Sequence, residues 1–307
     1  MQVTDIWELV CAFWVLCGVL QLYYWLRVFA PLAWHRGTAR DSTPPVSVIV
    51  CVNKMTGQLA EMLNALGRQN YPACEVIVVN DGGDRDISQV IRETGEPVRE
   101  VVLSPEIKTG PGKKPALALG IRNARHDWLL LTDADCLVSK QWVRGMIGHA
   151  EDGKRVVLGY GPLTGRPGWT ALLARYDNVL IAMQYLGHAL AGQPYMGVGR
   201  NLLYHRSLFD KAGAFSGHAE IASGDDDLFV QAVANKQNTA ICLDPETFAW
   251  SPPELTIAGL VHQKRRHLST SPRYRPAIKA TLFLFAATFV SWWIGGFLLA
   301  GFDPSPS

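Results

Sequence analysis

The stretch Trp128-Leu-Leu-Leu-Thr-Asp-Ala-Asp135 carries the decisive pattern of this chain. Its first four residues form a continuous apolar run, which is typical of a strand buried on both faces of a sheet. Two carboxylates, Asp133 and Asp135, follow at once and are therefore expected in the loop just beyond the strand. Ligands of open α/β sheets bind at the carboxyl ends of the strands, so this loop is the first candidate for a functional site.

Apolar runs and helical segments alternate on the amino-terminal side of this stretch. The predicted strands are 46–52, 75–79, 98–103 and 128–131. Apolar residues at helical spacing lie between them, from Leu59 to Leu66, from Ile87 to Ile91 and across residues 115–124. This alternation predicts an α/β fold with a mostly parallel, Rossmann-like sheet that is covered on both faces.

Both ends of the chain carry long uncharged segments. Leu9–Leu26 has 18 residues without a charge and Ala280–Phe302 has 23, close to the roughly 20 residues that cross a bilayer. Buried core helices are the alternative. Basic residues flank both segments on the inner side: Arg27, Arg36, Arg40, Arg273, Arg275 and Lys279. The positive-inside rule therefore places the middle of the chain in the cytoplasm.

The expected organisation has three parts. Residues 1–31 form a transmembrane anchor, residues 32–276 a cytoplasmic domain and residues 277–307 a second transmembrane segment. The protein is expected to be integral to the cell membrane, with both termini outside. A cleaved signal peptide is not favoured, because no basic region precedes the first apolar segment. The amphipathic helix expected at 169–190 can pack on the sheet or lie in the membrane interface.

Composition excludes several classes of function. The formal net charge is only +2, so no nucleic-acid partner is expected. None of the six cysteines forms a C-x-x-C pair, which argues against a zinc cage or a thioredoxin-like motif and favours free thiols in a reducing compartment.

Asp133 and Asp135 are the candidate metal ligands. Mg²⁺ and Mn²⁺ prefer oxygen donors, and one or two carboxylates together with substrate phosphates complete their coordination. An ordinary Asp-rich turn is the alternative. A second acidic loop, Asn80-Asp-Gly-Gly83, follows a neighbouring strand at the same sheet edge. Asp81 in that loop can accept from a base or ribose, and a simple turn is its alternative.

Two lysines begin the helix at 115–124. Gly110-Pro-Gly-Lys-Lys-Pro115 is not a Walker motif, because no Ser or Thr follows the lysines. Lys113 or Lys114 can meet a phosphate at this helix start, while a solvated loop lysine is the alternative for at least one of them.

Two clusters in the second half carry further chemistry. Asp225-Asp-Asp227 precedes an apolar helix start, so these carboxylates either cap that helix or supply a general base whose pKa is raised by its neighbours. Gln263-Lys-Arg-Arg-His267 is basic and close to the second apolar segment. It serves either as a positive-inside anchor or, through Arg266, as a phosphate site.

In this order, the motifs resemble a membrane-bound, inverting glycosyltransferase of the family-2 type with a GT-A fold, over about residues 44–270. The resemblance implies a nucleotide-diphospho-sugar transferase domain with a Mg²⁺ or Mn²⁺ cofactor. It implies donor contacts from Asn53, Asp81, Lys113 and Asp133, with Asp135 on the metal. It also implies Asp225 as the catalytic base, with Asp226 as the second candidate for that role. It further implies catalytic roles for Gln263 and for Arg266, which would stabilise the leaving diphosphate, and acceptor-side roles for Gly199, Asn201 and His267.

Three positions depart from the family pattern. Lys54 stands where an acidic residue is usual, and Asn80 where the first aspartate of the uridine loop is usual. Both bear on base recognition, and UDP stays the expected nucleotide. His267 replaces the tryptophan that helps to hold the growing sugar in processive synthases, which favours a single addition.

The resemblance therefore implies direct displacement at the anomeric carbon of a UDP-sugar by a hydroxyl of a membrane lipid or lipid-linked glycan. Two alternatives stay open. A processive polysaccharide synthase is expected to need more membrane helices than two, although related enzymes carry further helices and the chain could be a shortened form. A degenerate, non-catalytic nucleotide-sugar-binding membrane protein is the other.

Overall fold

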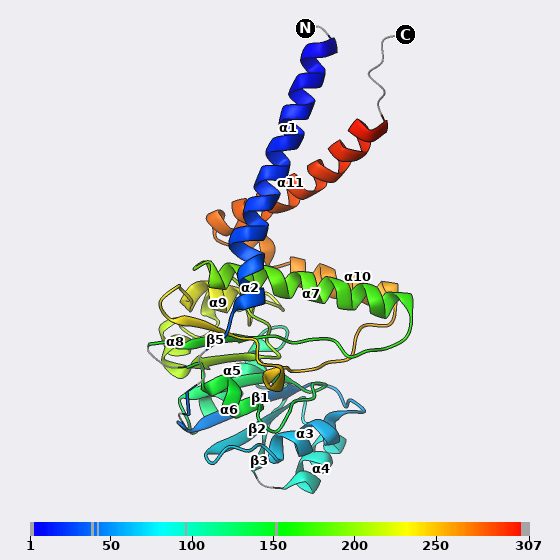
Figure 1. The fold of residues 1–307 in the computed structure, drawn as a ribbon. Coiled ribbons are helices and arrows are strands. Elements are labelled where there is room, and N and C mark those ends of the chain that lie inside the picture. The colour runs from blue at the N-terminus through cyan, green and yellow to red at the C-terminus, as the bar shows by residue number, and fades with distance from the viewer. Residues whose placement is uncertain (1–2, 38–39, 42, 96, 151–152, 302–307) are drawn as a thin grey trace. The chain divides into compact units, whose positions relative to one another are not determined.

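The computed structural model describes residues 3–37, 40–41, 43–95, 97–150 and 153–301 (Figure 1). The chain divides into two compact units. One comprises Met1–Trp34 with Tyr274–Ser307, and the other comprises His35–Arg273.

The larger unit is built on a seven-stranded sheet in the order β3-β2-β1-β4-β6-β5-β7. Its strands are β1 (Val46–Val52), β2 (Cys74–Asp81), β3 (Val98–Leu103), β4 (Trp128–Asp133), β5 (Val156–Gly159), β6 (Leu202–His205) and β7 (Thr239–Cys242). β6 runs antiparallel to both of its neighbours, and the other pairings are parallel. The predicted α/β class and the four predicted strands are confirmed. The last three strands have four residues each, too short for a clear apolar pattern.

Helices connect these strands. The α-helices of the larger unit are α3 (Leu59–Gly67), α4 (Arg85–Thr94), α5 (Lys114–Asn123), α6 (Trp142–Ile147), α7 (Trp169–Leu190), α8 (Arg206–Lys211), α9 (Asp227–Val233) and α10 (Ile257–Leu268). Short turns of 3₁₀-helix lie at η2 (Ser216–His218), η3 (Pro245–Thr247) and η4 (Ser271–Arg273).

Both faces of the sheet are covered, as the near-continuous apolar strands predict. On one face, Val48 and Val50 of β1 belong to a buried cluster with residues of α3, α4 and α6. On the other face, Ile77 and Val79 of β2 pack with Ala116 of α5. This double cover leaves the carboxyl ends of the parallel strands as the open edge on which a ligand can bind.

The smaller unit is a pair of long helices. One consists of α1 (Val3–Tyr24), a π-helical turn η1 (Trp25–Phe29) and α2 (Ala30–Trp34), and the other is α11 (Pro276–Gly301). The indoles of Trp14 and Trp292 stack at 5.8 Å, and Gln21 Nε2 donates to Thr288 Oγ1 at 2.7 Å. Polar groups paired between two helices, in an otherwise apolar surrounding, are typical of membrane helix pairs.

Both of these helices are long and apolar enough to cross a membrane. Their large apolar side chains are exposed, including Phe283 at 72% and Phe297 at 74%. Exposure on this scale is not that of helices buried in the core of a soluble domain, because burial of apolar area is what stabilises such a core.

Candidate functional site

Three neighbouring strands end at one edge of the sheet and carry polar side chains there. Asp133 closes β4 and pairs in register with Cys51 of β1. On the other side of β1, Asp81 closes β2, and Asn53 Nδ2 donates to the carbonyl oxygen of Asp81 at 3.1 Å. Parallel pairing thus brings Asp81 and Asp133, which are about fifty positions apart in the sequence, to one edge of the sheet, as the sequence predicts.

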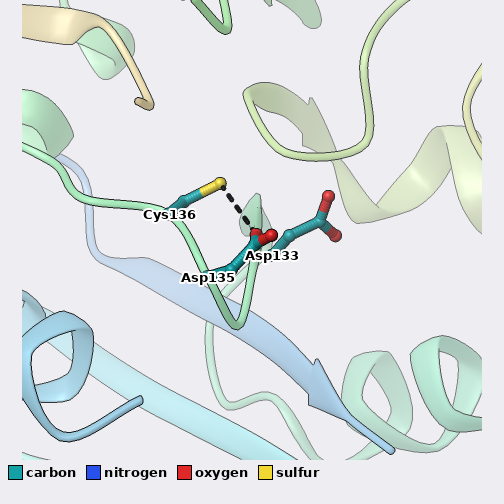
Figure 2. Close-up of side chains that lie close together, drawn as sticks. All are labelled: Asp133, Asp135 and Cys136. Atoms are coloured by element: carbon teal, nitrogen blue, oxygen red, sulfur yellow. Dashed lines mark hydrogen bonds between the residues drawn. The ribbon is translucent and has the colours of Figure 1, made fainter. Parts of the chain in front are cut away.

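The loop after β4 turns back on itself, because the Cys136 N–H donates to the Asp133 carbonyl at 3.1 Å. Figure 2 shows the side chains of Asp133, Asp135 and Cys136, whose ligand atoms lie within 4.8 Å of one another. Burial raises the pKa of the Cys136 thiol to about 12, so this sulfur is protonated, and it contacts Asp135 Oδ1 at 3.7 Å. The two carboxylates are therefore the donors of this group that suit a metal.

The charges around the two carboxylates differ. Burial alone would raise the pKa of Asp133, but the Lys113 ammonium, which donates to Asp133 Oδ1 at 2.5 Å, holds it below its usual value. Burial and the neighbouring Asp133 charge raise the pKa of Asp135. A hard divalent cation fits this donor set, because it would compensate two mutually repelling carboxylates with the oxygen ligands that Mg²⁺ and Mn²⁺ prefer.

A cavity of about 460 Å³ opens beside this loop. Its wall contains most of the residues that the sequence singled out, drawn from segments more than a hundred positions apart: Lys113, Asp133, Asp135, Gly199, Asp225, Asp226, Gln263, Arg266 and His267. A concave site with convergent charged groups is the usual form of a substrate site.

The three adjacent aspartates of this cavity region have separate environments. Asp226 is the N-cap of α9, and it accepts from the N–H groups of Asp227 at 2.7 Å and Gly199 at 3.1 Å. Asp227 is buried and accepts from the Thr270 hydroxyl at 2.5 Å. Asp225 lines the cavity with no hydrogen bond to any residue that the structure describes. The helix cap and the candidate base are thus different members of one cluster.

The pKa of Asp226 is raised to about 8. Burial is the largest cause, followed by the charges of Asp225 and Asp227, while the two backbone N–H bonds act in the opposite direction. Asp226 therefore holds its proton more readily than a free carboxyl, and its oxygens are already engaged by the N–H groups of Asp227 and Gly199, which suits a capping and supporting residue.

The helix α10 presents the basic end of the cavity. Thr256 caps it by accepting from the Gly259 N–H at 3.0 Å. Gln263 and Arg266 are three positions apart and therefore share one face of the helix, and both line the cavity. Arg266 Nη2 lies 3.0 Å from His267 Nε2. Desolvation of the imidazole at the cavity wall and the nearby Arg266 cation lower the pKa of His267 to about 4, so the imidazole is neutral and can accept this bond.

Some predicted residues lie apart from this cavity. Asp81 is buried and pairs with Lys108 at 2.6 Å, and with Asn53 it lies outside the cavity wall. Asn80 is buried and donates to Ser88 and Glu100, so it braces the loop.

The expectation that Asn201 lies on the acceptor side of the cavity is corrected. It is fully buried, its Oδ1 accepts from the Trp142 indole at 3.0 Å, and its Nδ2 donates to the carbonyls of Tyr160 and Thr247. A side chain whose donors and acceptor are already used in the interior has a structural task.

Two residues at the site were not predicted as site residues. Arg200 lines the cavity beside Asp133 and Asp135, and its guanidinium donates to the Gly161 carbonyl at 2.6 Å. In the sequence, its position between Gly199 and Asn201 could have indicated that Arg200 is a site residue. Lys108 carried no signal, because it pairs with Asp81 only through the folding of an irregular segment.

Comparisons with known proteins extend this picture. The model of the glycosyltransferase-like family 2 matches residues 44–270. A poly-beta-1,6-N-acetyl-D-glucosamine synthase of Staphylococcus aureus is 22% identical over 227 residues, which cover 71% of this chain and 52% of that protein. The chain thus spans about half the length of the curated relatives that it matches.

Solved structures show the same fold. A mannosyltransferase from Pyrobaculum calidifontis, in complex with GDP-Man and Mn²⁺, is 18% identical with a TM-score of 0.63, covering 97% of this chain and 88% of that chain. Residues 1–349 of S. aureus TarS are 18% identical with a TM-score of 0.52, covering 74% of this chain and 72% of that chain.

A mostly parallel GT-A-like sheet, with an Asp-x-Asp loop and a carboxylate cluster in one cavity, defines the class as a glycosyltransferase. Since the family model covers most of the chain, the chain belongs to glycosyltransferase-like family 2 and is an enzyme of that class. The predicted family and fold are confirmed.

Proposed function

We propose that this enzyme transfers a sugar from a nucleotide-diphospho-sugar, linked to UDP, to a hydroxyl acceptor with inversion at the anomeric carbon. The observation that carries the proposal is the shared cavity, which joins the Asp-x-Asp loop, Asp225 and Arg266. These three parts provide the donor end, the base and the leaving-group end of a displacement reaction.

The donor is proposed to bind along the sheet edge. Asp81 and Asn53 would hold the nucleoside, Asp133 and Asp135 would hold Mg²⁺ or Mn²⁺, and Lys113 would approach the phosphates. When bound, the cation supplies charge stabilisation to a diphosphate. The Pyrobaculum mannosyltransferase, which was solved with GDP-Man and Mn²⁺, supports this class of donor and metal.

Asp225 is proposed as the base. Its carboxylate would take the proton of the acceptor hydroxyl while the oxygen forms a bond to the anomeric carbon. The bond from that carbon to the diphosphate breaks, and its electron pair leaves with the nucleoside diphosphate. Arg266, with Gln263 on the same helix face, is placed to stabilise the charge that develops there. Asp226, which accepts from the Gly199 N–H, would keep Asp225 in position.

The acceptor is proposed to be a membrane lipid or lipid-linked glycan. Helix α7 exposes large apolar side chains, including Trp169 at 72%, and α10 exposes Ile257 and Val261. The two helices contact each other and Lys264 pairs with Asp177 between them. With residues 1–31 and 277–307 in the bilayer, and residues 32–276 in the cytoplasm, a lipid hydroxyl would reach His267 and Gly199 on the acceptor side of the cavity.

Polysaccharide synthesis is the second candidate. It is favoured by the name of the staphylococcal relatives, which are poly-beta-1,6-N-acetyl-D-glucosamine synthases. His267, which replaces the tryptophan of the family pattern, supports single addition instead. The mass of the product separates these two functions, because polymerisation gives a ladder and a single addition gives one mass increment.

The decisive experiment incubates the purified full chain with Mn²⁺, a panel of UDP-sugars and GDP-mannose, and membrane lipid extract. We expect one lipid to gain one sugar mass, and Asp225→Asn to lower the transfer rate by at least about a hundredfold. Asp210→Asn, an exposed aspartate on α8, is the matched control and should transfer at the wild-type rate. Transfer by Asp225→Asn at the wild-type rate would refute the base.

A further inference from the structure

A second cavity, of about 390 Å³, lies in the larger unit and shares no lining residue with the catalytic cavity. Six basic or imidazole side chains line it: His35, Arg36, Arg40, His149, Lys154 and Lys236. None of the described residues that line it is acidic. The whole chain has a net charge of only +2, so this concentration of positive charge is local and not a consequence of composition.

The place of this cavity in the sheet separates it from the donor site. Lys154 precedes β5 and Lys236 precedes β7, so both lie at the amino ends of these strands. The strands β5 and β7 are parallel to each other, and through β6 they run in the same direction as β4. Asp133 lies at the opposite, carboxyl end of β4. The basic cavity is thus not an extension of the sheet edge on which the donor is proposed to bind.

Two imidazoles border this space. The Nε2 atom of His35 is buried and has no hydrogen-bond partner within the described ranges. Such an atom costs free energy unless a ligand or water satisfies it. His149 Nδ1 is bonded to the Gly145 carbonyl at 2.9 Å. A Cβ atom at Gly37 would lie 2.2 Å from His149 Nε2, so the glycine keeps the backbone close to this ring.

The balance of charges favours an anion. Lys154 Nζ donates to the Lys236 carbonyl at 3.0 Å, which, as far as the described residues go, leaves two of its three N–H groups for a ligand. Ala189 and Leu190, at the carboxyl end of α7, also line the cavity. The partial negative charge of that helix end, about half an elementary charge, opposes an anion. The full positive charges of Arg36, Lys154 and Lys236 outweigh it.

We propose that this cavity binds a phosphate group. A phosphate oxygen array accepts several charge-assisted hydrogen bonds from arginine and lysine at once, and an imidazole N–H adds another. Its source is either a free phosphate ion or the head group of an anionic phospholipid. The segment that contributes His35 and Arg36 follows directly on α2 in the sequence, next to a helix that is apolar enough to cross a membrane.

The test is calorimetric titration of the full chain in neutral detergent at constant ionic strength. The titrants are inorganic phosphate, dihexanoyl phosphatidic acid and, as a zwitterionic control, dihexanoyl phosphatidylcholine. We expect saturable binding of phosphatidic acid or phosphate and none of phosphatidylcholine. Arg36→Gln with Lys236→Gln should weaken the binding roughly tenfold, because two full charges leave the wall.

A matched control removes the same charge elsewhere. Lys140→Gln with Lys211→Gln changes two exposed lysines that do not line the cavity, and it should leave the affinity unchanged. Should the double cavity variant fail to fold, the single variant Lys236→Gln replaces it, with an expected weakening of about threefold. Absence of saturable binding to the wild type, or equal weakening in cavity and control variants, would overturn the proposal.

The two sources are told apart by their affinities. If phosphatidic acid binds more than about ten times as tightly as phosphate, the extra affinity comes from its buried acyl carbons and the site is assigned to a lipid. Equal affinities assign it to a free phosphate ion. Either result supports the site, and neither depends on the transfer activity proposed above.

Discussion

Asp226 accepts two backbone hydrogen bonds at the start of α9, while its neighbour Asp225 faces the cavity and accepts none from the described residues. Chemically identical side chains at consecutive positions therefore have different surroundings. The pair illustrates how a helix cap can hold the proposed base: the cap fixes the backbone, and the preceding residue lines the cavity.

The raised pKa of Asp226 predicts a pH-dependent stability. Its pKa is about 8 in the folded protein against an ordinary 3.8, so the folded state binds this proton more tightly. The stabilisation is complete below about pH 4 and is lost as the pH rises through about 8. Asp226→Asn removes this titration. We expect the melting temperature of the variant to rise relative to the wild type between pH 5 and pH 8.5.

Thermal unfolding at both pH values measures this difference. Asp210→Asn, which changes an exposed carboxylate on α8, serves as the control. Its melting temperature should differ from that of the wild type by the same amount at both pH values. A constant difference between Asp226→Asn and the wild type across that range would contradict a raised pKa.

The Asp-x-Asp loop predicts that metal binding depends on its two carboxylates and not on the Cys136 sulfur. Asp135→Asn should raise the Mn²⁺ concentration for half-maximal activity by at least about tenfold. Cys136→Ser should leave it unchanged, because the thiol is protonated and buried. Titration of Mn²⁺ into metal-free enzyme measures both. A large shift in Cys136→Ser would mean that the sulfur is a ligand after all.

At the scale of elements, β6 and α6 are joined through one buried amide. Asn201, just before β6, receives a hydrogen bond from Trp142 of α6 and donates to two carbonyls. Asn201→Ala would leave these partners unsatisfied. We expect a loss of about 3 kcal/mol in the free energy of unfolding, or about 6–12 °C in melting temperature for a domain of this size.

Asn64→Ala is the control for this change, since Asn64 is exposed and, among the described residues, its side chain bonds only within its own helix, α3. It should shift the melting temperature by no more than about 2 °C. The acceptor KM distinguishes the two roles of Asn201. A variant of unchanged stability with a raised acceptor KM would return this residue to the acceptor side.

Helix α10 shows how one element supplies several parts of a site. Its cap at Thr256 sets the start of the helix, and the spacing of three between Gln263 and Arg266 then directs both towards one cavity. The sequence predicted these residues but not the helix that carries them. Of its apolar residues Leu260 is buried, whereas Ile257, Val261 and Leu268 are exposed.

At the scale of the whole molecule, two units have different physical characters. The larger unit buries apolar strands on both sides of a sheet, whereas the smaller unit exposes apolar side chains along two paired helices. In water, the second arrangement is unfavourable, whereas hydrocarbon suits exposed apolar side chains, and Trp14 Nε1 and Gln21 Nε2 donate to groups of the other helix.

This character predicts a membrane topology. With the basic flanks in the cytoplasm, the carboxyl end of the chain is expected outside. In a bacterial host, a carboxyl-terminal alkaline phosphatase fusion should be active, and a green fluorescent protein fusion at the same place should be dark. The reverse pattern would place the terminus in the cytoplasm and contradict the proposed topology. A fusion after Arg273, at the end of η4, is the control that should fluoresce.

Local sequence patterns were sufficient to predict the α/β class, the first four strands, α7 and the Asp-x-Asp loop. These follow from local patterns, because apolar runs and helical spacing are properties of neighbouring residues. The order of motifs also identified the family, and within the resemblance it named Asp225, Gln263 and Arg266.

The surroundings of the individual site residues, in contrast, follow from contacts that exist only in the folded chain. Asn201 turned out to be an interior brace, Asp226 a cap with a raised pKa, and Arg200 a cavity residue. Burial and hydrogen-bond partners come from segments far apart in the chain, so local pattern does not encode them. The Asp-x-Asp loop was visible in eight consecutive letters, whereas the cavity beside it required the meeting of α10, the 196–200 segment and the start of α9.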